Sequence, residues 1–172
     1  MKTEIKLNSI MKFYVTAILS LFFVVSAIAQ KTHPDSGFTN KAEAKNELVN
    51  GVKEGKWIEY DTCYDPGDTI GKLCSYRLII FKSDRPTGTV RQYDISGILK
   101  SEIPMKNGKE NGMERRYYDS GKLMLEAQYV NDKRNGLEKE YYENGKLKSE
   151  TNYTLGKAGE TKSYDEKGNE IK

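Results

Sequence analysis

Three glutamates at a regular interval are the residues whose type and spacing could do acid–base chemistry. Glu102, Glu126 and Glu150 recur every 24 residues. Two carboxylates that flank a sugar linkage can act as acid and as nucleophile or base in glycoside hydrolysis. Here each glutamate occurs once per copy of a repeat and can face a basic residue on a neighbouring strand, which favours a structural role. No catalytic residue is therefore predicted.

Other side chains that could act as catalysts or metal ligands are scarce. His33 is the only histidine, so the chain offers a single candidate for histidine-based acid–base or triad catalysis. Cys63 and Cys74 have no nearby histidine to complete a zinc site. The aspartates of residues 61–68 lack the spacing and the terminal glutamate of a calcium-binding hand. We therefore expect a non-enzymatic protein without a metal or cofactor.

A repeat of roughly 24 residues determines where these carboxylates lie. The copies, of which the first and last are irregular, begin at Gly55, Gly88, Gly112, Gly136 and Gly159. Five residues after each glycine comes a tyrosine: Tyr60, Tyr93, Tyr117, Tyr141 and Tyr164. A fixed period of this length is typical of proteins whose units stack on their neighbours.

Each copy has the composition of a β-hairpin. The segment 137–142 is rich in residues that suit a pleated surface, and Asn144-Gly145 behind it is a strong hairpin signal. A second turn in each copy is again rich in glycine and asparagine. The sequence predicts an all-β fold, a meander of antiparallel hairpins in a single elongated sheet over residues 48–172, with an insertion at about residues 61–86.

Two geometries are open for the first turn of each copy. A two-residue turn pairs Tyr142 with Leu147 and creates an ion pair between the strands of each hairpin. The ion pairs would be Arg91–Glu102, Arg115–Glu126 and Lys139–Glu150. A three-residue loop with a glycine bulge instead pairs Tyr141 with Leu147 and places both on one face with Tyr153. We favour the bulge, because the first tyrosine recurs in all five copies and a recurring residue should be the buried one.

The N-terminal residues have the pattern of an export signal. Residues 13–29 are almost all apolar or small, and Ala27-Ile28-Ala29 is a small-x-small cleavage pattern. We expect a signal peptide over residues 1–29, cleaved near Ala29, and a periplasmic or secreted protein; an uncleaved membrane anchor is the alternative. Residues 30–47 have few apolar side chains and are expected to form a flexible arm.

Cleavage would also change the charge. It removes three lysines and one glutamate, so Lys plus Arg falls from 28 to 25, Asp plus Glu from 25 to 24, and the formal net charge from +3 to +1. A nearly neutral chain with interleaved charges lacks the basic stripe that nucleic acid requires. Nucleic acid is therefore not an expected partner.

A few residues depart from the repeat and are candidates for function. Cys63 and Cys74 lie in the insertion, where an oxidising compartment would allow a disulfide, although two free thiols remain the alternative. A second tyrosine, Tyr118 or Tyr142, follows the recurring tyrosine only in the two central copies, and we expect both to be exposed and to contact a partner. Trp57 is either a cap on the first hairpin or a contact anchor.

The segments Gly55-Lys-Trp57-Ile-Glu-Tyr60 and Gly136-Leu-Glu-Lys-Glu-Tyr-Tyr-Glu-Asn-Gly-Lys-Leu147 resemble the bacterial variant of the MORN repeat (membrane occupation and recognition nexus). The resemblance covers about residues 48–172 and extends to antitoxin-labelled proteins built from this variant. It implies a curved antiparallel sheet that contacts proteins or lipids. We expect a protein-binding module at the cell envelope; a peripheral membrane protein and an antitoxin-like binding protein are the alternatives.

Overall fold

The computed structural model describes residues 37–67 and 69–171. The predicted signal peptide and residues 30–36 of the predicted arm lie outside them. Within the described residues the chain forms a 12-stranded antiparallel sheet. The strands are β1 (Glu47–Val49), β2 (Val52–Cys63), β3 (Lys72–Lys82), β4 (Arg85–Asp94), β5 (Leu99–Lys106), β6 (Lys109–Glu110), β7 (Gly112–Tyr117), β8 (Leu123–Val130), β9 (Lys133–Tyr141), β10 (Leu147–Thr154), β11 (Lys157–Tyr164) and β12 (Glu170–Ile171).

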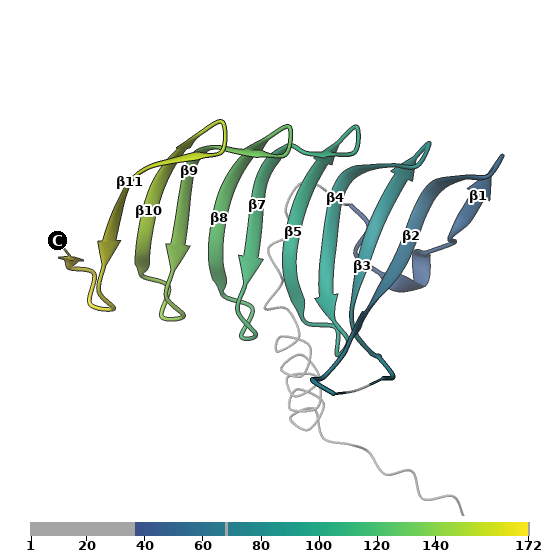
Figure 1. The fold of residues 1–172 in the computed structure, drawn as a ribbon, viewed down its shortest axis with the longest axis horizontal. Helices are drawn as coiled ribbons and strands as arrows, with labels where there is room; N and C mark the ends of the chain where they lie inside the picture. Colours follow the sequence, from purple (N-terminus) through teal and green to yellow (C-terminus); the bar gives the residue numbers. More distant parts are fainter. Residues whose placement is uncertain (1–36, 68, 172) are drawn as a thin grey trace, which may run out of the picture. The chain divides into compact units, whose positions relative to one another are not determined.

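The strands follow one another across the sheet in chain order (Figure 1). Only β6, which pairs with β5, lies off this path. The predicted all-β meander of hairpins is therefore confirmed. The helical structure in the described residues is the 3-10 helix η1 (Lys41–Glu43), so none of their helices has the length and apolar character needed to cross a membrane.

Three-residue turns with a glycine bulge line one rim of the sheet, the lower rim in Figure 1. In the β7–β8 turn the Tyr118 N–H donates to the Lys122 carbonyl at 2.9 Å, and the Gly121 N–H donates to the Tyr118 carbonyl at 2.9 Å. Gly121 has a φ of 77°, a left-handed conformation that glycine adopts without a steric cost. The expected bulge is confirmed, and we call this edge the three-residue rim.

The register combines features of both turn geometries. Tyr141 pairs with Leu147, as the bulge predicts, yet Lys139 still lies opposite Glu150. The ladder shifts between Leu147 and Ser149, so one extra residue restores the register that the two-residue turn would give. The shift also changes which side chains of β10 point to each face of the sheet, because side chains alternate along a strand. Tyr153 pairs with Gly136 and lies on the opposite face from Tyr141, so the expectation of one shared face was wrong.

Two-residue turns line the other rim, the upper rim in Figure 1. Both central residues of each turn have positive φ, as a type I′ turn requires. The central pairs are Asn50-Gly51, Ser83-Asp84, Asn107-Gly108, Asn131-Asp132 and Leu155-Gly156. Asparagine and glycine tolerate this conformation, whereas Leu155, with a φ of 50°, does not fit it well. We call this edge the two-residue rim.

The strained turn allows a direct test. Leu155→Asn is expected to raise the free energy of unfolding by about 1 kcal/mol, because asparagine relieves the left-handed strain and completes an Asn-Gly turn. Denaturant unfolding measures the change. Leu155→Ala is the matched control, since it removes the exposed side chain but leaves the strain. An equal gain in both variants would contradict the strain argument.

Apolar clusters lie on both faces of the N-terminal half of the sheet. One face carries Tyr93, Tyr117, Tyr141 and Tyr164, and we call it the tyrosine face. Its core consists of Phe38, Tyr76 and Leu78. The opposite face has a core of Ile79, Phe81 and Val90, joined by Trp57, Ile103 and Met105 at its margin. Further along the opposite face Ala127 is fully buried.

The segment before β1 belongs to the folded unit. Phe38 is 1% exposed and packs on the tyrosine face, where its carbonyl accepts a hydrogen bond from Arg91 Nη1 at 3.2 Å. Asn46 pairs with the backbone of Ile58 through both its side-chain oxygen and its nitrogen, and so covers part of the edge of β2. The expected flexible arm over residues 30–47 is therefore wrong for residues 37–47. The physical reason is that the apolar side chain of Phe38 packs against Tyr76 and Leu78, which are distant in the sequence.

Candidate interaction surface: the tyrosine face and the two rims

A glutamate–tyrosine ladder runs along the tyrosine face and joins successive hairpins. Glu102 Oε1 accepts from Arg91 Nε at 2.9 Å within its own hairpin, and Glu102 Oε2 accepts from the Tyr117 hydroxyl of the next hairpin at 2.7 Å. Later hairpins repeat this arrangement. The equivalent contacts are Arg115–Glu126 at 3.1 Å, Tyr141–Glu126 at 3.4 Å and Tyr164–Glu150 at 3.3 Å.

Burial of the ladder decreases along the chain. The side chains of Arg91 and Glu102 are 5% and 11% exposed, whereas those of Arg115 and Glu126 are 29% and 26% exposed. Both oxygens of each of these glutamates accept from groups of the sheet itself. The carboxylates that could have formed a glycosidase pair are thus engaged in linking neighbouring hairpins.

Tyr117 makes the ladder sensitive to alkaline pH. Burial, and then the hydrogen bond to the Glu102 carboxylate, raise the pKa of Tyr117 well above its ordinary value of 10.0. The folded chain therefore keeps this proton at a pH where the unfolded chain has lost it. The contribution of Tyr117 to the free energy of unfolding is therefore complete below the pKa of tyrosine in the unfolded chain. It is lost as the pH rises through the pKa of Tyr117 in the folded chain.

We therefore expect the free energy of unfolding to fall as the pH rises above 10.0, the ordinary tyrosine pKa. Tyr117→Phe should make this fall less steep, because one of the perturbed hydroxyls is gone. Urea unfolding at neutral pH and above the tyrosine pKa measures the slope. Tyr64→Phe, at an exposed tyrosine, is the control; an unchanged slope in Tyr117→Phe would contradict the expectation.

Tyr118 and Tyr142 lie on the three-residue rim and link hairpins through their hydroxyls. Tyr118 donates to the carbonyl of Tyr141 at 2.6 Å, and Tyr142 donates to the carbonyl of Tyr164 at 2.8 Å. Both side chains are half-buried, so the expectation that they are exposed was wrong. The burial of these two tyrosines was not predictable from the sequence, because the acceptor of each hydroxyl is a backbone group of the next hairpin.

These hairpins correspond to a known family of repeats. The family model of the MORN repeat variant matches residues 86–107, 110–131 and 134–154. The chain contains MORN repeat variants. No curated protein matches the sequence.

Each matched MORN repeat is one hairpin, and successive repeats start 24 residues apart. The three hairpins are β4–β5, β7–β8 and β9–β10. The hydroxyl contacts of Tyr117 and Tyr118 therefore join one MORN repeat to its neighbours. The hairpin β2–β3 before residue 86 and the strands β11 and β12 after residue 154 continue the same sheet.

A second polar network lies on the opposite face of the MORN repeats and was not predicted. Arg134 donates to the hydroxyls of Tyr129 at 3.1 Å and Tyr153 at 3.2 Å, and forms a 2.9 Å ion pair with Glu138. Burial raises the pKa of the Glu138 carboxyl despite this guanidinium. Glu114, at the same repeat position, is also buried. The sequence contained one sign of this network, because both glutamates lie two residues after the glycine that opens their repeat.

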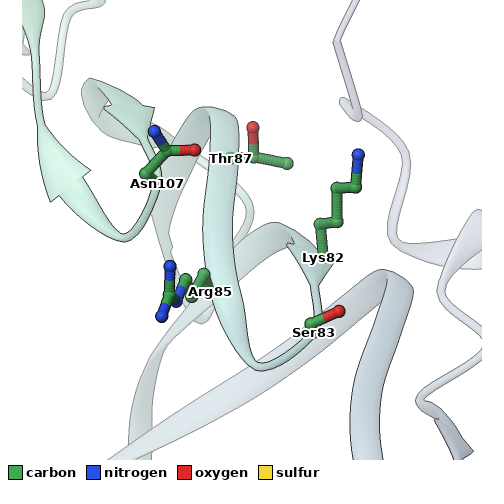
Figure 2. Close-up of a pocket in the computed structure, with 5 residues that line it drawn as sticks. All are labelled: Lys82, Ser83, Arg85, Thr87 and Asn107. Atoms are coloured by element: carbon green, nitrogen blue, oxygen red, sulfur yellow. The ribbon is translucent and has the colours of Figure 1, made fainter.

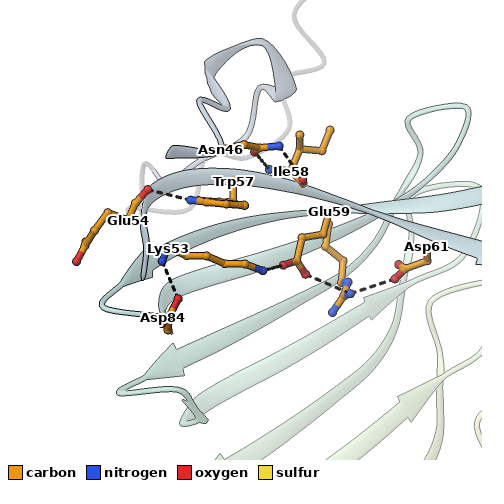
Figure 3. Close-up of polar contacts among 9 residues, drawn as sticks. Asn46, Lys53, Glu54, Trp57, Ile58, Glu59, Asp61 and Asp84 are labelled. Atoms are coloured by element: carbon orange, nitrogen blue, oxygen red, sulfur yellow. Dashed lines mark hydrogen bonds and ion pairs between the residues drawn. The ribbon is translucent and has the colours of Figure 1, made fainter. Parts of the chain in front are cut away.

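Trp57 lies on the hairpin before the first matched MORN repeat. Its Nε1 donates to the Glu54 carbonyl at 2.9 Å (Figure 3), and its ring meets the edge of Phe81 at a centroid distance of 6.0 Å. The Lys53 ammonium lies 4.9 Å from the ring centroid. This half-buried position, at the margin of the core of the opposite face, is that of a cap on the first hairpin.

Charged side chains lie on both sides of Trp57 along β2. Lys53 Nζ contacts Glu59 at 2.5 Å (Figure 3). Arg77 Nη2, from β3, lies 3.4 Å from Glu59 and 3.0 Å from Asp61. The insertion begins at the end of this row. There Cys63 and Cys74 form a disulfide with their Cα atoms 5.7 Å apart. The bond joins β2 to β3 where their connecting loop begins and ends.

Acidic and sulfur-containing side chains do not converge on a cation site. Within residues 37–67 and 69–171, no group of three or more His, Cys, Asp or Glu residues is placed to hold a metal ion. Asp61 instead accepts hydrogen bonds from Ser75 and Arg77. The described surface thus offers aromatic and charged rims as the candidates for function.

Proposed function

We propose that this protein is an exported, non-enzymatic MORN repeat module that binds another protein at the cell envelope through its three-residue rim. MORN repeats are generally non-enzymatic modules that interact with proteins or membranes. The finer assignment to a protein partner rests on the rim itself.

The observation that carries the proposal is the anchoring of Tyr118 and Tyr142. Each hydroxyl is bonded to a backbone carbonyl, so each ring is held in place while part of it remains accessible. A partner that packs against such rings loses little conformational entropy, and tyrosines of this kind are enriched among the residues that dominate binding. The turn residues beside the rings are exposed and polar: Asp119, Ser120, Glu143 and Asn144.

Two features support export. Residues 13–29 have the apolar composition of a signal peptide, and Ala27-Ile28-Ala29 follows the cleavage pattern. The disulfide between Cys63 and Cys74 is a bond typical of oxidising compartments. N-terminal sequencing of the protein purified from the envelope fraction tests the assignment; a chain that keeps residues 1–29 and remains in the cytoplasm would contradict it.

The partner is sought by affinity capture from the envelope fraction of the native cell. Three baits are compared: the wild type, Tyr118→Ala with Tyr142→Ala, and Tyr118→Phe with Tyr142→Phe. We expect the alanine pair to lose the partner and the phenylalanine pair to keep most of it, because phenylalanine retains the apolar ring. Thermal unfolding of each bait confirms that it is folded. Equal capture by all three baits would contradict a contact through this rim.

The alternative is a peripheral membrane protein, since MORN repeats also contact membranes. Binding to anionic lipid should weaken as salt is added, because it depends on screened charges. Sedimentation with phosphatidylglycerol vesicles at low and high salt separates the two functions. Salt-sensitive sedimentation, with no protein captured from the envelope fraction, would favour the alternative.

A further inference from the structure

Four cations gather on the two-residue rim, at the opposite ends of the strands from Tyr118 and Tyr142. They are Lys82, Arg85, Lys106 and Lys109, which flank the turns of two adjacent hairpins. Among the ion pairs of the described residues, none involves these four side chains. Most cations of the ladder and of β2, by contrast, are paired with carboxylates.

The register places these like charges directly opposite one another. Lys82 pairs with Arg85 across one turn, and Lys106 pairs with Lys109 across the next. Like charges at opposed positions of an antiparallel pair are destabilising. The equivalent positions of the other two-residue turns have no such conflict: Val49–Val52, Val130–Lys133 and Thr154–Lys157. The repulsion is therefore confined to two neighbouring hairpins.

Two adjacent hollows lie beside these turns. One, of about 300 Å³, is lined by Lys82, Ser83, Arg85, Thr87 and Asn107. Figure 2 shows Lys82 and Ser83 across from Arg85 and Asn107. The other, of about 520 Å³, is lined by Arg85, Lys106, Asn107, Lys109, Asn111 and Asn131. Arg85 and Asn107 line both hollows, and all the lining side chains are cationic, amide or hydroxyl groups.

Carboxylates near these turns accept hydrogen bonds from the protein. Glu54 Oε1 accepts from the Ser83 N–H at 2.8 Å and from the Ser83 hydroxyl at 3.2 Å. Asp84 Oδ1 accepts from the Lys53 N–H at 2.6 Å, and Asp132 Oδ1 accepts from the Glu110 N–H at 2.8 Å. Asp84 and Asp132 thus each bond to a neighbouring hairpin, and the four rim cations remain able to bind a further anion. Guanidinium, ammonium, amide and hydroxyl donors are the groups that bind phosphate and sulfate oxygens.

We propose that this rim site, formed by Lys82, Arg85, Lys106 and Lys109, binds a linear polyanion whose phosphate or sulfate groups occupy both hollows. Equivalent positions of adjacent hairpins lie two strands apart, about 10 Å. A chain with several oxoanions can fill both hollows at once and gains from both, whereas a single oxoanion fills one. The bound anion then offsets the repulsion between the cations.

The test is isothermal titration of the purified protein with long-chain inorganic polyphosphate at low salt. Arg85→Gln with Lys106→Gln should weaken binding about tenfold or more, since each removes a charged donor. Lys148→Gln with Lys167→Gln removes the same charge elsewhere and should leave binding nearly unchanged. Orthophosphate should bind much more weakly than polyphosphate. Equal losses in both double variants, equal affinity for orthophosphate, or no binding of polyphosphate would overturn the proposal.

A second variant keeps the test independent of folding defects. Lys109→Glu places opposite charges at the Lys106–Lys109 pair, so it should raise the midpoint of thermal unfolding while it weakens polyphosphate binding. Loss of stability with unchanged binding would count against the site. Phosphatidylglycerol vesicles are the remaining arm: binding to vesicles but not to polyphosphate would replace this proposal with a membrane contact. None of these outcomes depends on the three-residue rim.

Discussion

Replacing Glu102 by alanine is expected to lower the free energy of unfolding by about 3 kcal/mol, because it removes the carboxylate that neutralises a buried guanidinium. The Arg91 side chain is 5% exposed, and its Nε lies 2.9 Å from Glu102 Oε1. The substitution also removes the acceptor of the Tyr117 hydroxyl. Denaturant unfolding followed by circular dichroism measures the loss.

The repeat supplies a matched control for this substitution. Glu126 holds the same position one MORN repeat later, but its side chain and that of Arg115 are more than a quarter exposed. Water can therefore solvate Arg115 once the carboxylate is gone, and Glu126→Ala is expected to cost about 1 kcal/mol. Equal losses in the two variants would show that burial does not set the strength of the ladder.

Phe38→Ala is expected to lower the free energy of unfolding by about 3 kcal/mol. Phe38 is 1% exposed, and alanine would leave a cavity above Tyr76 and Leu78 on the tyrosine face. Phe38→Leu, which retains most of the apolar volume, should cost less than about 1.5 kcal/mol. Denaturant unfolding gives both values.

Limited proteolysis adds a local readout for the same variant. If Phe38 holds the segment 37–46 on the sheet, its loss should make that segment susceptible to cleavage before the hairpins unfold. A chain with Phe38→Ala that unfolds like the wild type and resists cleavage would show that this packing does not hold the segment.

Local signals predicted the fold well. The 24-residue period, the glycine five residues before each ladder tyrosine and the Asn-Gly and Ser-Gly pairs act over a few residues, and a hairpin depends on interactions of that range. Repetition then placed many hairpins in one meander. The bulge at Gly121 and Gly145 was predicted for the same reason, since a turn is determined largely by its own residues.

Contacts between distant segments were not predictable in the same way. The packing of Phe38 on Tyr76 joins residues 38 positions apart, and nothing near Phe38 in the sequence marks its partner. The extra residue between Leu147 and Ser149 reverses the face of Tyr153, because side chains alternate along a strand. Composition cannot reveal such a shift.

The sequence by itself determined the all-β class and the hairpin order, favoured the bulged turn, and showed that the chain has a single histidine. Only the tertiary structure decided which groups meet: Glu102 with Arg91 and Tyr117, Tyr118 with the backbone of the next hairpin, and Lys82 with Arg85 on the two-residue rim. The physical reason is range. Turns follow from local backbone preferences, whereas ion pairs, buried carboxylates and hollows depend on register, and register follows from the packing of whole strands.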